Sequence, residues 1–272
     1  MDNQTLNLQL SSCEEPYPTI YFVLNTTLLF FGFPSTVIII TKLLNKIYKT
    51  RSFSAAEAFL LQINFTNICL FISFSLLILF ELNVINFSST LYLLFYSPSL
   101  TARPIFLLAM CVIFYLAIVH PVAYMATKTW FHWKWLVITF VWIYTLAVNL
   151  AIVFNMYSST HPAFMAMLLM TLPITLFFNI TTVRALTSSG PGNDGQFLNP
   201  AKKKAFRIIL SIQVVLLMFY VPRTYVYVYL NIAPVDYGRF ICAEGQGILM
   251  VAKLSEFAMP VIFLYSLRKL GV

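Results

Sequence analysis

The sequence predicts an all-α integral membrane protein built as a bundle of seven transmembrane helices. Its 272 residues are 60% hydrophobic and only 10% charged, whereas a soluble domain typically carries about 25% charged residues. Runs of about 20 apolar residues, the length that crosses the hydrocarbon of a bilayer, recur along the chain. We expect each run to be a helix, because a backbone in lipid must satisfy its own hydrogen bonds.

Charged and polar breaks divide the apolar runs into seven spans. Residues 1–16 form a polar N-terminal segment before span one. The stretch from Trp135 to Val183 contains no charged residue and is too long for one helix, so we expect a break at Tyr157–Pro162. The expected spans are residues 17–41, 55–80, 91–119, 135–156, 163–186, 206–230 and 245–267, and residues 268–272 form a tail.

The basic residues between the spans predict the orientation of the bundle. Of the 17 Lys and Arg residues, 13 follow spans one, three, five or seven: Lys42, Lys46, Lys49, Arg51, Lys128, Lys134, Arg184, Lys202, Lys203, Lys204, Arg207, Arg268 and Lys269. Because short basic loops stay in the cytoplasm, we expect the N-terminus outside and the C-terminus inside. The net charge of +8 therefore reflects topology and lipid contact, and no nucleic-acid partner is expected.

Other motifs are few. The sequons at Asn3 and Asn86 fall on the expected outer side, where glycosylation takes place. The sequence has no nucleophile elbow, no HExxH and no glycine-rich phosphate loop, so we do not expect an enzyme. No two cysteines stand at metal-ligand spacing, and we expect neither a metal site nor a cofactor.

The segment FYLAIVHPVAYM, Phe114–Met125, resembles the end of the third helix and the second inner loop of rhodopsin-like (class A) G-protein-coupled receptors. Their pattern is Asp-Arg-Tyr-x-Ala-Ile-x-x-Pro-x-x-Tyr, and the matching residues are Tyr115, Ala117, Ile118, Pro121 and Tyr124. Residues placed like the family's tryptophan and helix prolines are Trp142, Pro173, Pro222 and Pro260. The resemblance implies a plasma-membrane receptor, most like the orphan, chemosensory or peptide branches, that senses an extracellular ligand and couples to a heterotrimeric G protein.

Several polar residues of the family pattern are replaced. Ile113 and Phe114 stand where the family has Asp-Arg, and Asn67 stands for the helix-two aspartate. Phe114 cannot pair with a carboxylate, so the polar lock that separates two states in the family has become an apolar contact. A second hypothesis is therefore a seven-helix protein that does not signal and acts as a dimer partner or trafficking component. A transporter is less favoured, because no inverted repeat is visible.

An ion pair is expected where the family binds sodium. By alignment with the family, Arg103 in span three and Glu256 in span seven reach the same level as Asn67 in span two. We expect Arg103 and Glu256 to pair, with Asn67 hydrogen-bonded nearby, because a charge at this depth needs a partner. The alternative is that each charged side chain reaches the interface or pairs elsewhere.

A second group of polar residues lies at the levels that line the ligand cavity in the family. Arg223, Lys253, Tyr220 and Tyr227 would form a pocket for a carboxylate, phosphate or sulfate. Tyr227 is included because it lies four residues after Arg223 and shares its helix face. In the alternative reading, Arg223 extends outward to the interface and Lys253 pairs with Glu256.

The resemblance also implies a disulfide between Cys13 and Cys242. These residues precede spans one and seven on the expected outer side. Helices one and seven are neighbours in the family, and chemokine-type receptors bridge the same two segments. Cys69 and Cys111 lie inside spans and are expected to behave as small apolar residues. Two free thiols at Cys13 and Cys242 remain the alternative.

Overall fold

The computed structural model describes residues 17–51, 53–82, 84, 89–129, 132–154 and 157–187, together with residues 214, 217–218, 220–226, 228–229, 247–248 and 250–254. The described residues form helices and include no strand. The helices with defined bounds are α2 (Tyr17–Thr50), α3 (Ala55–Glu81), α4 (Ser89–Val119), α5 (Pro121–Thr129), α6 (Trp133–Val153) and α7 (Tyr157–Thr187).

Four of these helices contain stretches long and apolar enough to cross a membrane. The stretches are Phe22–Lys49, Ala55–Glu81, Thr90–Val119 and Trp133–Ala151, and α7 contains a shorter apolar stretch at Leu169–Ala185. Their length fits the roughly 20 residues that a bilayer requires. The prediction of an all-helical protein embedded in a membrane is therefore confirmed.

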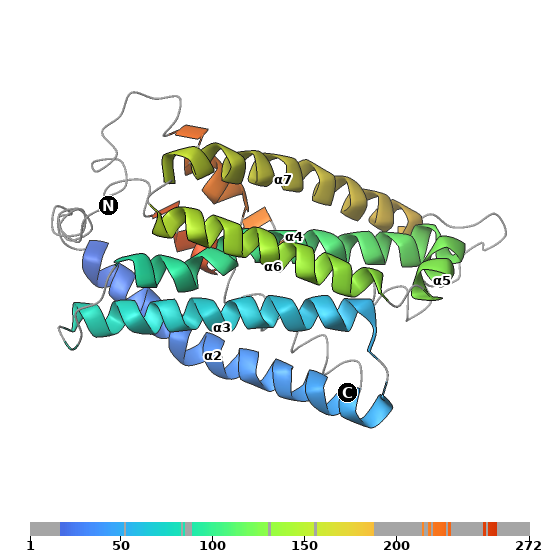
Figure 1. The fold of residues 1–272 in the computed structure, drawn as a ribbon, viewed down its shortest axis with the longest axis horizontal. Coiled ribbons are helices and arrows are strands. Elements are labelled where there is room, and N and C mark those ends of the chain that lie inside the picture. The colour runs from blue at the N-terminus through green and yellow to red at the C-terminus, as the bar shows by residue number, and fades with distance from the viewer. Residues whose placement is uncertain are drawn as a thin grey trace.

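The long helices lie side by side, and α5 turns across one end of the bundle (Figure 1). At this end, here called the α5 end, α2, α4 and α7 finish and α3 and α6 begin. Helix α4 lies in the middle of the bundle and packs against α3, α5, α6 and α7. Among the described helices, α4 therefore packs against the largest number of others.

The main apolar core joins α2, α3, α4 and α6. The rings of Phe59 and Phe106 stack with centroids 6.1 Å apart. Because lipid is as apolar as the interior, close van der Waals contact holds such helices together more than the hydrophobic effect does. Fully buried members of this core include Ile39, Phe59, Ile63, Ala102, Phe106, Leu107, Val141 and Tyr220.

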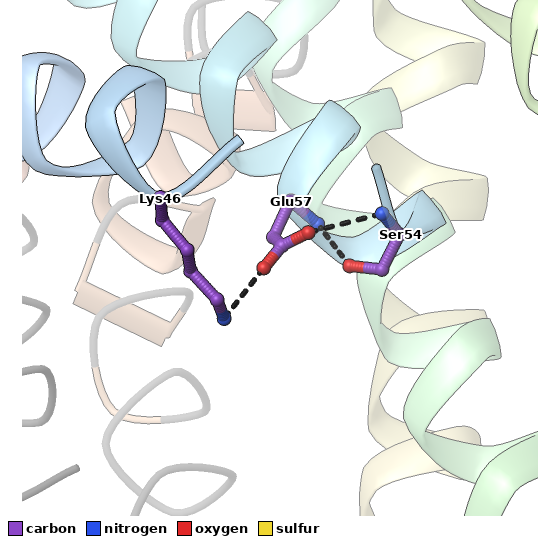
Figure 2. Close-up of polar contacts among 3 residues, drawn as sticks. All are labelled: Lys46, Ser54 and Glu57. Atoms are coloured by element: carbon purple, nitrogen blue, oxygen red, sulfur yellow. Dashed lines mark hydrogen bonds and ion pairs between the residues drawn. The ribbon is translucent and has the colours of Figure 1, made fainter. Parts of the chain in front are cut away.

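A charged and capped junction fixes α2 against α3 at the α5 end. The Lys46 Nζ lies 2.7 Å from Glu57 Oε1 (Figure 2). Glu57 also accepts a hydrogen bond from the Ser54 backbone N–H, and the Ser54 hydroxyl accepts one from the Glu57 N–H. This reciprocal pair is a capping box, which satisfies backbone donors at the start of α3.

The two helices keep one antiparallel register along their length. A Cβ on Gly32 would lie 2.7 Å from the Phe71 ring, so the helices need glycine here to approach closely. Fourteen residues separate Gly32 from Lys46 on α2, and fourteen separate Glu57 from Phe71 on α3. One turn from the Gly32–Phe71 contact, this register places Thr36 at the level of Asn67.

Hydrogen bonds between side chains align α4 with α6. The Ser97 hydroxyl donates to Asn149 Oδ1, and the Thr101 hydroxyl donates to the Thr145 hydroxyl at 3.3 Å. Small polar residues allow such bonds and close approach between helices in a membrane. Ser97 and Thr101 lie on either side of Pro98, where a proline removes a backbone hydrogen bond from α4.

The helix bounds differ from the expected spans by more than three residues at two places. Helix α2 continues to Thr50, nine residues beyond the expected end at Thr41. Its final turns carry Lys42, Lys46 and Lys49, and an α-helix can leave the hydrocarbon without ending. Helix α7 begins at Tyr157, inside the expected break at Tyr157–Pro162, and thus six residues before the expected start of the fifth span.

Candidate functional site: a buried cationic cluster

Four cationic side chains are buried among the described residues of the bundle, and one of them, Lys134 at 5% exposed, donates a hydrogen bond to the Phe53 carbonyl at the α5 end. Arg103 on α4 is 1% exposed, and Arg223 and Lys253 are each 5% exposed. Burying a cation in a membrane protein costs free energy unless other groups compensate, so these residues mark a place of structural or functional importance. The neighbours of each cation decide what it can do.

The Arg223 side chain lies over an aromatic ring instead of extending to solvent. Its guanidinium carbon is 5.9 Å from the centroid of the Tyr96 ring on α4. The negative face of the ring stabilises the cation, and this effect is stronger when both groups are desolvated. Tyr96 lies seven residues after the start of α4 at Ser89, roughly 10 Å along the axis at 1.5 Å per residue. The contact is therefore near the end of the bundle opposite α5.

Tyr220 lies within electrostatic range of both Arg103 and Arg223. The Tyr220 side chain is fully buried, and its hydroxyl lies next to the Thr171 hydroxyl of α7. Both guanidinium groups lie close enough to Tyr220 to act on it electrostatically. Helices α4 and α7 and residues 220–226 thus bring two cations and a phenol into one polar region, which we call the Arg103–Arg223 cluster.

Lys253 is held by residues of α2 and α3. Its Nζ donates a hydrogen bond to Asn25 Oδ1 of α2 at 2.8 Å and lies 5.1 Å from the centroid of the Phe74 ring of α3. The resemblance implies that Lys253 and Arg223 share one ligand pocket, and Tyr96, beside Arg223, packs against the apolar cluster that contains Phe74, beside Lys253. The Lys253 ammonium, however, already has Asn25 as its hydrogen-bond partner. Arg223 is therefore the stronger candidate for a ligand contact.

Asn67 is buried at the level of Thr36. Its exposed fraction is 2%, and neither Asn67 Oδ1 nor the Thr36 hydroxyl has a hydrogen-bond partner among the described residues. The stacking of Phe59 on Phe106 sets the register of α3 against α4. In this register Arg103 lies between the levels of Phe59 and Asn67 along α3.

The expected partner of Arg103 cannot be placed. Glu256 and Tyr227, together with the expected disulfide residues Cys13 and Cys242, lie outside the residues whose side chains are described, and the glycosylation candidates Asn3 and Asn86 lie outside the described residues as well. The described cysteines, Cys69 and Cys111, are free thiols. The ion pair, the disulfide and the glycosylation sites stay predictions.

The residues of the family-like motif occupy the α5 end. Ile113 is buried in the main core, and Phe114 and Tyr124 pack against it. Pro121 is exposed at the start of α5. The Tyr115 hydroxyl lies 3.1 Å from Nε2 of His120 and forms a hydrogen bond with it. The two residues that replace Asp-Arg therefore contribute apolar packing.

Sequence reasoning missed the polar contacts that orient α6. Besides the bonds to Ser97 and Thr101, α6 donates a 2.9 Å hydrogen bond from Trp142 Nε1 to Gln62 Oε1 of α3. The polar pairs Ser97/Thr101 and Thr145/Asn149 each have a spacing of four residues, which puts each pair on one helix face. That spacing is the signal that could have revealed them.

Comparison with known proteins does not assign a family. The sequence matches no protein-family model, and no curated protein matches it significantly. No group of three or more His, Cys, Asp or Glu side chains suited to a metal ion occurs in the described part of the chain. The cationic cluster, with its arginines and tyrosines, is chemically suited to binding an anion.

Proposed function

We propose that the chain is a divergent seven-helix receptor of the rhodopsin-like type that resides in the plasma membrane. It senses an anionic ligand from outside and transmits the signal to a heterotrimeric G protein. In this proposal the sixth span is residues 206–230 and the seventh is residues 245–267. The described helical residues 220–226 fall in the sixth span, and residues 250–254 fall in the seventh. The resemblance of Phe114–Met125 to the family motif supports this assignment.

The burial of Arg223 beside Tyr96 is the observation that carries the ligand proposal. A guanidinium offers several N–H donors in a planar fork that matches a carboxylate, sulfate or phosphate. Arg103 and Tyr220 add a second cation and a hydroxyl to the same region. An anionic ligand would gain charge-assisted hydrogen bonds here that an uncharged ligand could not form.

The charge distribution supports an orientation with the α5 end in the cytoplasm. Basic residues of the described chain at this end include Lys42, Lys46, Lys49, Arg51, Lys134 and Arg184. Under the positive-inside rule, the opposite end, nearer the Tyr96–Arg223 contact, faces outside. An N-terminal epitope tag should stain on intact cells; staining only after permeabilisation would reverse the orientation and remove the ligand proposal.

A seven-helix protein without signalling is the second candidate. The packing of Ile113 and Phe114 in or against the main core favours it, because these side chains cannot form the family's polar lock. Such a protein would act as a dimer partner or in trafficking. Output to a G protein distinguishes the two candidates.

The decisive experiment measures second messengers in cells that express the chain with a panel of G proteins. The probes are small carboxylates and alkyl sulfates, with uncharged amides of the same size for comparison. We expect responses to the anions only, loss in Arg223→Gln, and partial retention in Arg223→Lys. Arg184→Gln is the matched control, because Arg184 is exposed at the other end. Silence with every probe and G protein would favour the non-signalling candidate.

A further inference from the structure

A ring cluster joins α4, α7 and the start of α5 near the α5 end. The Tyr115 and Phe178 rings lie with centroids 5.0 Å apart at an interplanar angle of 57°. The Tyr115 ring also meets the His120 ring edge-on, with centroids 5.4 Å apart, in addition to their hydrogen bond. Both centroid separations lie in the range in which aromatic rings attract each other, and the Tyr115–His120 pair has the edge-to-face arrangement that such pairs prefer. We call Tyr115, Phe178 and His120 the aromatic clasp.

The clasp lies where α7 leaves the interior. Phe178 packs against the main core, and next to it Asn179 forms a hydrogen bond with the Cys111 thiol, one turn before Tyr115 on α4. Helix α7 continues for nine residues beyond Phe178 to Thr187, and Arg184 and Ala185 are exposed there. Phe178 is therefore well placed to hold this last part of α7 against α4.

We propose that the aromatic clasp is a conformational restraint that takes the place of the missing polar lock. With the rings in contact, the end of α7 stays against α4. Without the contact, residues 179–187 move away and change the surface presented at the α5 end. The restraint is a property of the helices, whereas its effect on signalling rests on the proposed receptor function.

The chemistry of the clasp distinguishes it from an ion pair. Ring contacts contribute through dispersion and quadrupole geometry, so they hold two helices without burying a charge at the membrane surface. His120 is exposed, whereas Phe178 is half-buried. Tyr115 forms a hydrogen bond with His120 and packs against the Phe178 ring of α7, and together these contacts fix the orientation of the Tyr115 side chain. Loss of the Phe178 ring should therefore free α7 more than loss of the Tyr115 hydroxyl does.

Hydrogen–deuterium exchange of the full chain in lipid nanodiscs tests the restraint directly. Phe178→Leu keeps most of the side-chain volume but removes the ring contact. We expect amide exchange in residues 179–187 to rise roughly two- to tenfold, with no change in α6. Tyr115→Phe should give a smaller rise. Ile180→Ala is the matched control, because Ile180 lies on the same helix and is exposed.

Basal second-messenger output, measured in parallel, separates the restraint from the receptor function. A local rise in exchange together with higher basal output supports both. A local rise without output from any G protein leaves the clasp supported and counts against the receptor. Unchanged exchange in Phe178→Leu, or an equal rise in Ile180→Ala or throughout α6, overturns the clasp whatever the output. If Phe178→Leu does not fold, Tyr115→Phe and Tyr115→Leu give the same comparison from α4.

Discussion

The Lys253 Nζ donates a 2.8 Å hydrogen bond to Asn25 Oδ1, and this bond joins residues 228 positions apart in the chain. It ties the helical segment 250–254 to α2, the first helix described. The Phe74 ring of α3 lies beside the same ammonium. The Lys253 ammonium thus links a helix near the start of the chain to a segment near its end. Lys253 therefore helps to hold the segment 250–254 against α2 and α3.

Removing the acceptor should destabilise the protein. We expect Asn25→Ala to cost about 1.5–3 kcal/mol of the free energy of unfolding, since a hydrogen bond to a buried charged group is lost. Asn25→Asp should retain or raise stability, because a carboxylate is a better partner for the ammonium. Thermal unfolding in detergent measures the difference. Thr27→Ala is the control, because the Thr27 hydroxyl is exposed and bonds only within α2. An equal loss in both variants would contradict the role of Lys253.

The Glu57 junction should contribute mainly through capping. We expect Glu57→Ala to cost about 1–2 kcal/mol, because it removes both the N3 partner of the capping box and the ion pair. Glu57→Gln keeps the reach to the Ser54 N–H, so its cost should be below about 1 kcal/mol. The Lys46 side chain is 40% exposed, and solvent weakens such a pair. Losses in Glu57→Gln and in Lys46→Ala as large as the loss in Glu57→Ala would contradict this and show that the charge pair dominates.

The ion pair that we expect between Arg103 and Glu256 is a prediction from the sequence alone. Neutralising either one should cost about 3–5 kcal/mol, because the remaining buried charge loses its partner. Exchanging the two charges should partly restore stability and delivery to the cell surface. A double-mutant cycle on Arg103→Met and Glu256→Gln measures the coupling. If the losses simply add, the two residues do not form a pair.

Restoring the family motif tests the missing lock. We expect Ile113→Asp with Phe114→Arg to raise basal or ligand-driven G-protein activation, because Tyr115 to Tyr124 still match the surrounding motif. Ile113→Asp alone should reduce surface expression, since Ile113 is buried in an apolar core. Surface-normalised second-messenger output is the measurement. No gain with any G protein would indicate that other departures from the family pattern, such as Asn67, also disable the switch.

Sequence reasoning succeeded where the cause is local. Bilayer length and low charge predict the membrane helices, because each helix satisfies its own backbone hydrogen bonds wherever its neighbours lie. The α3 start at Ala55 coincides with the expected one, since Ser54 and Glu57 form a cap within four residues. The short helix α5 was not expected, although Pro121 is a favourable first residue for a helix.

The amino-acid sequence by itself determined that the chain is helical and membrane-embedded, and that its interior holds rare cations. Only the tertiary structure decided that Arg223 lies over Tyr96, that Lys253 bonds to Asn25, and that the Phe71 ring lies against Gly32. The reason is physical: in a membrane the lipid-facing and inward-facing sides of a helix are both apolar, so periodicity does not reveal the rotation of each helix. Partners for buried polar groups depend on that rotation, which is set by contacts between residues far apart in the chain.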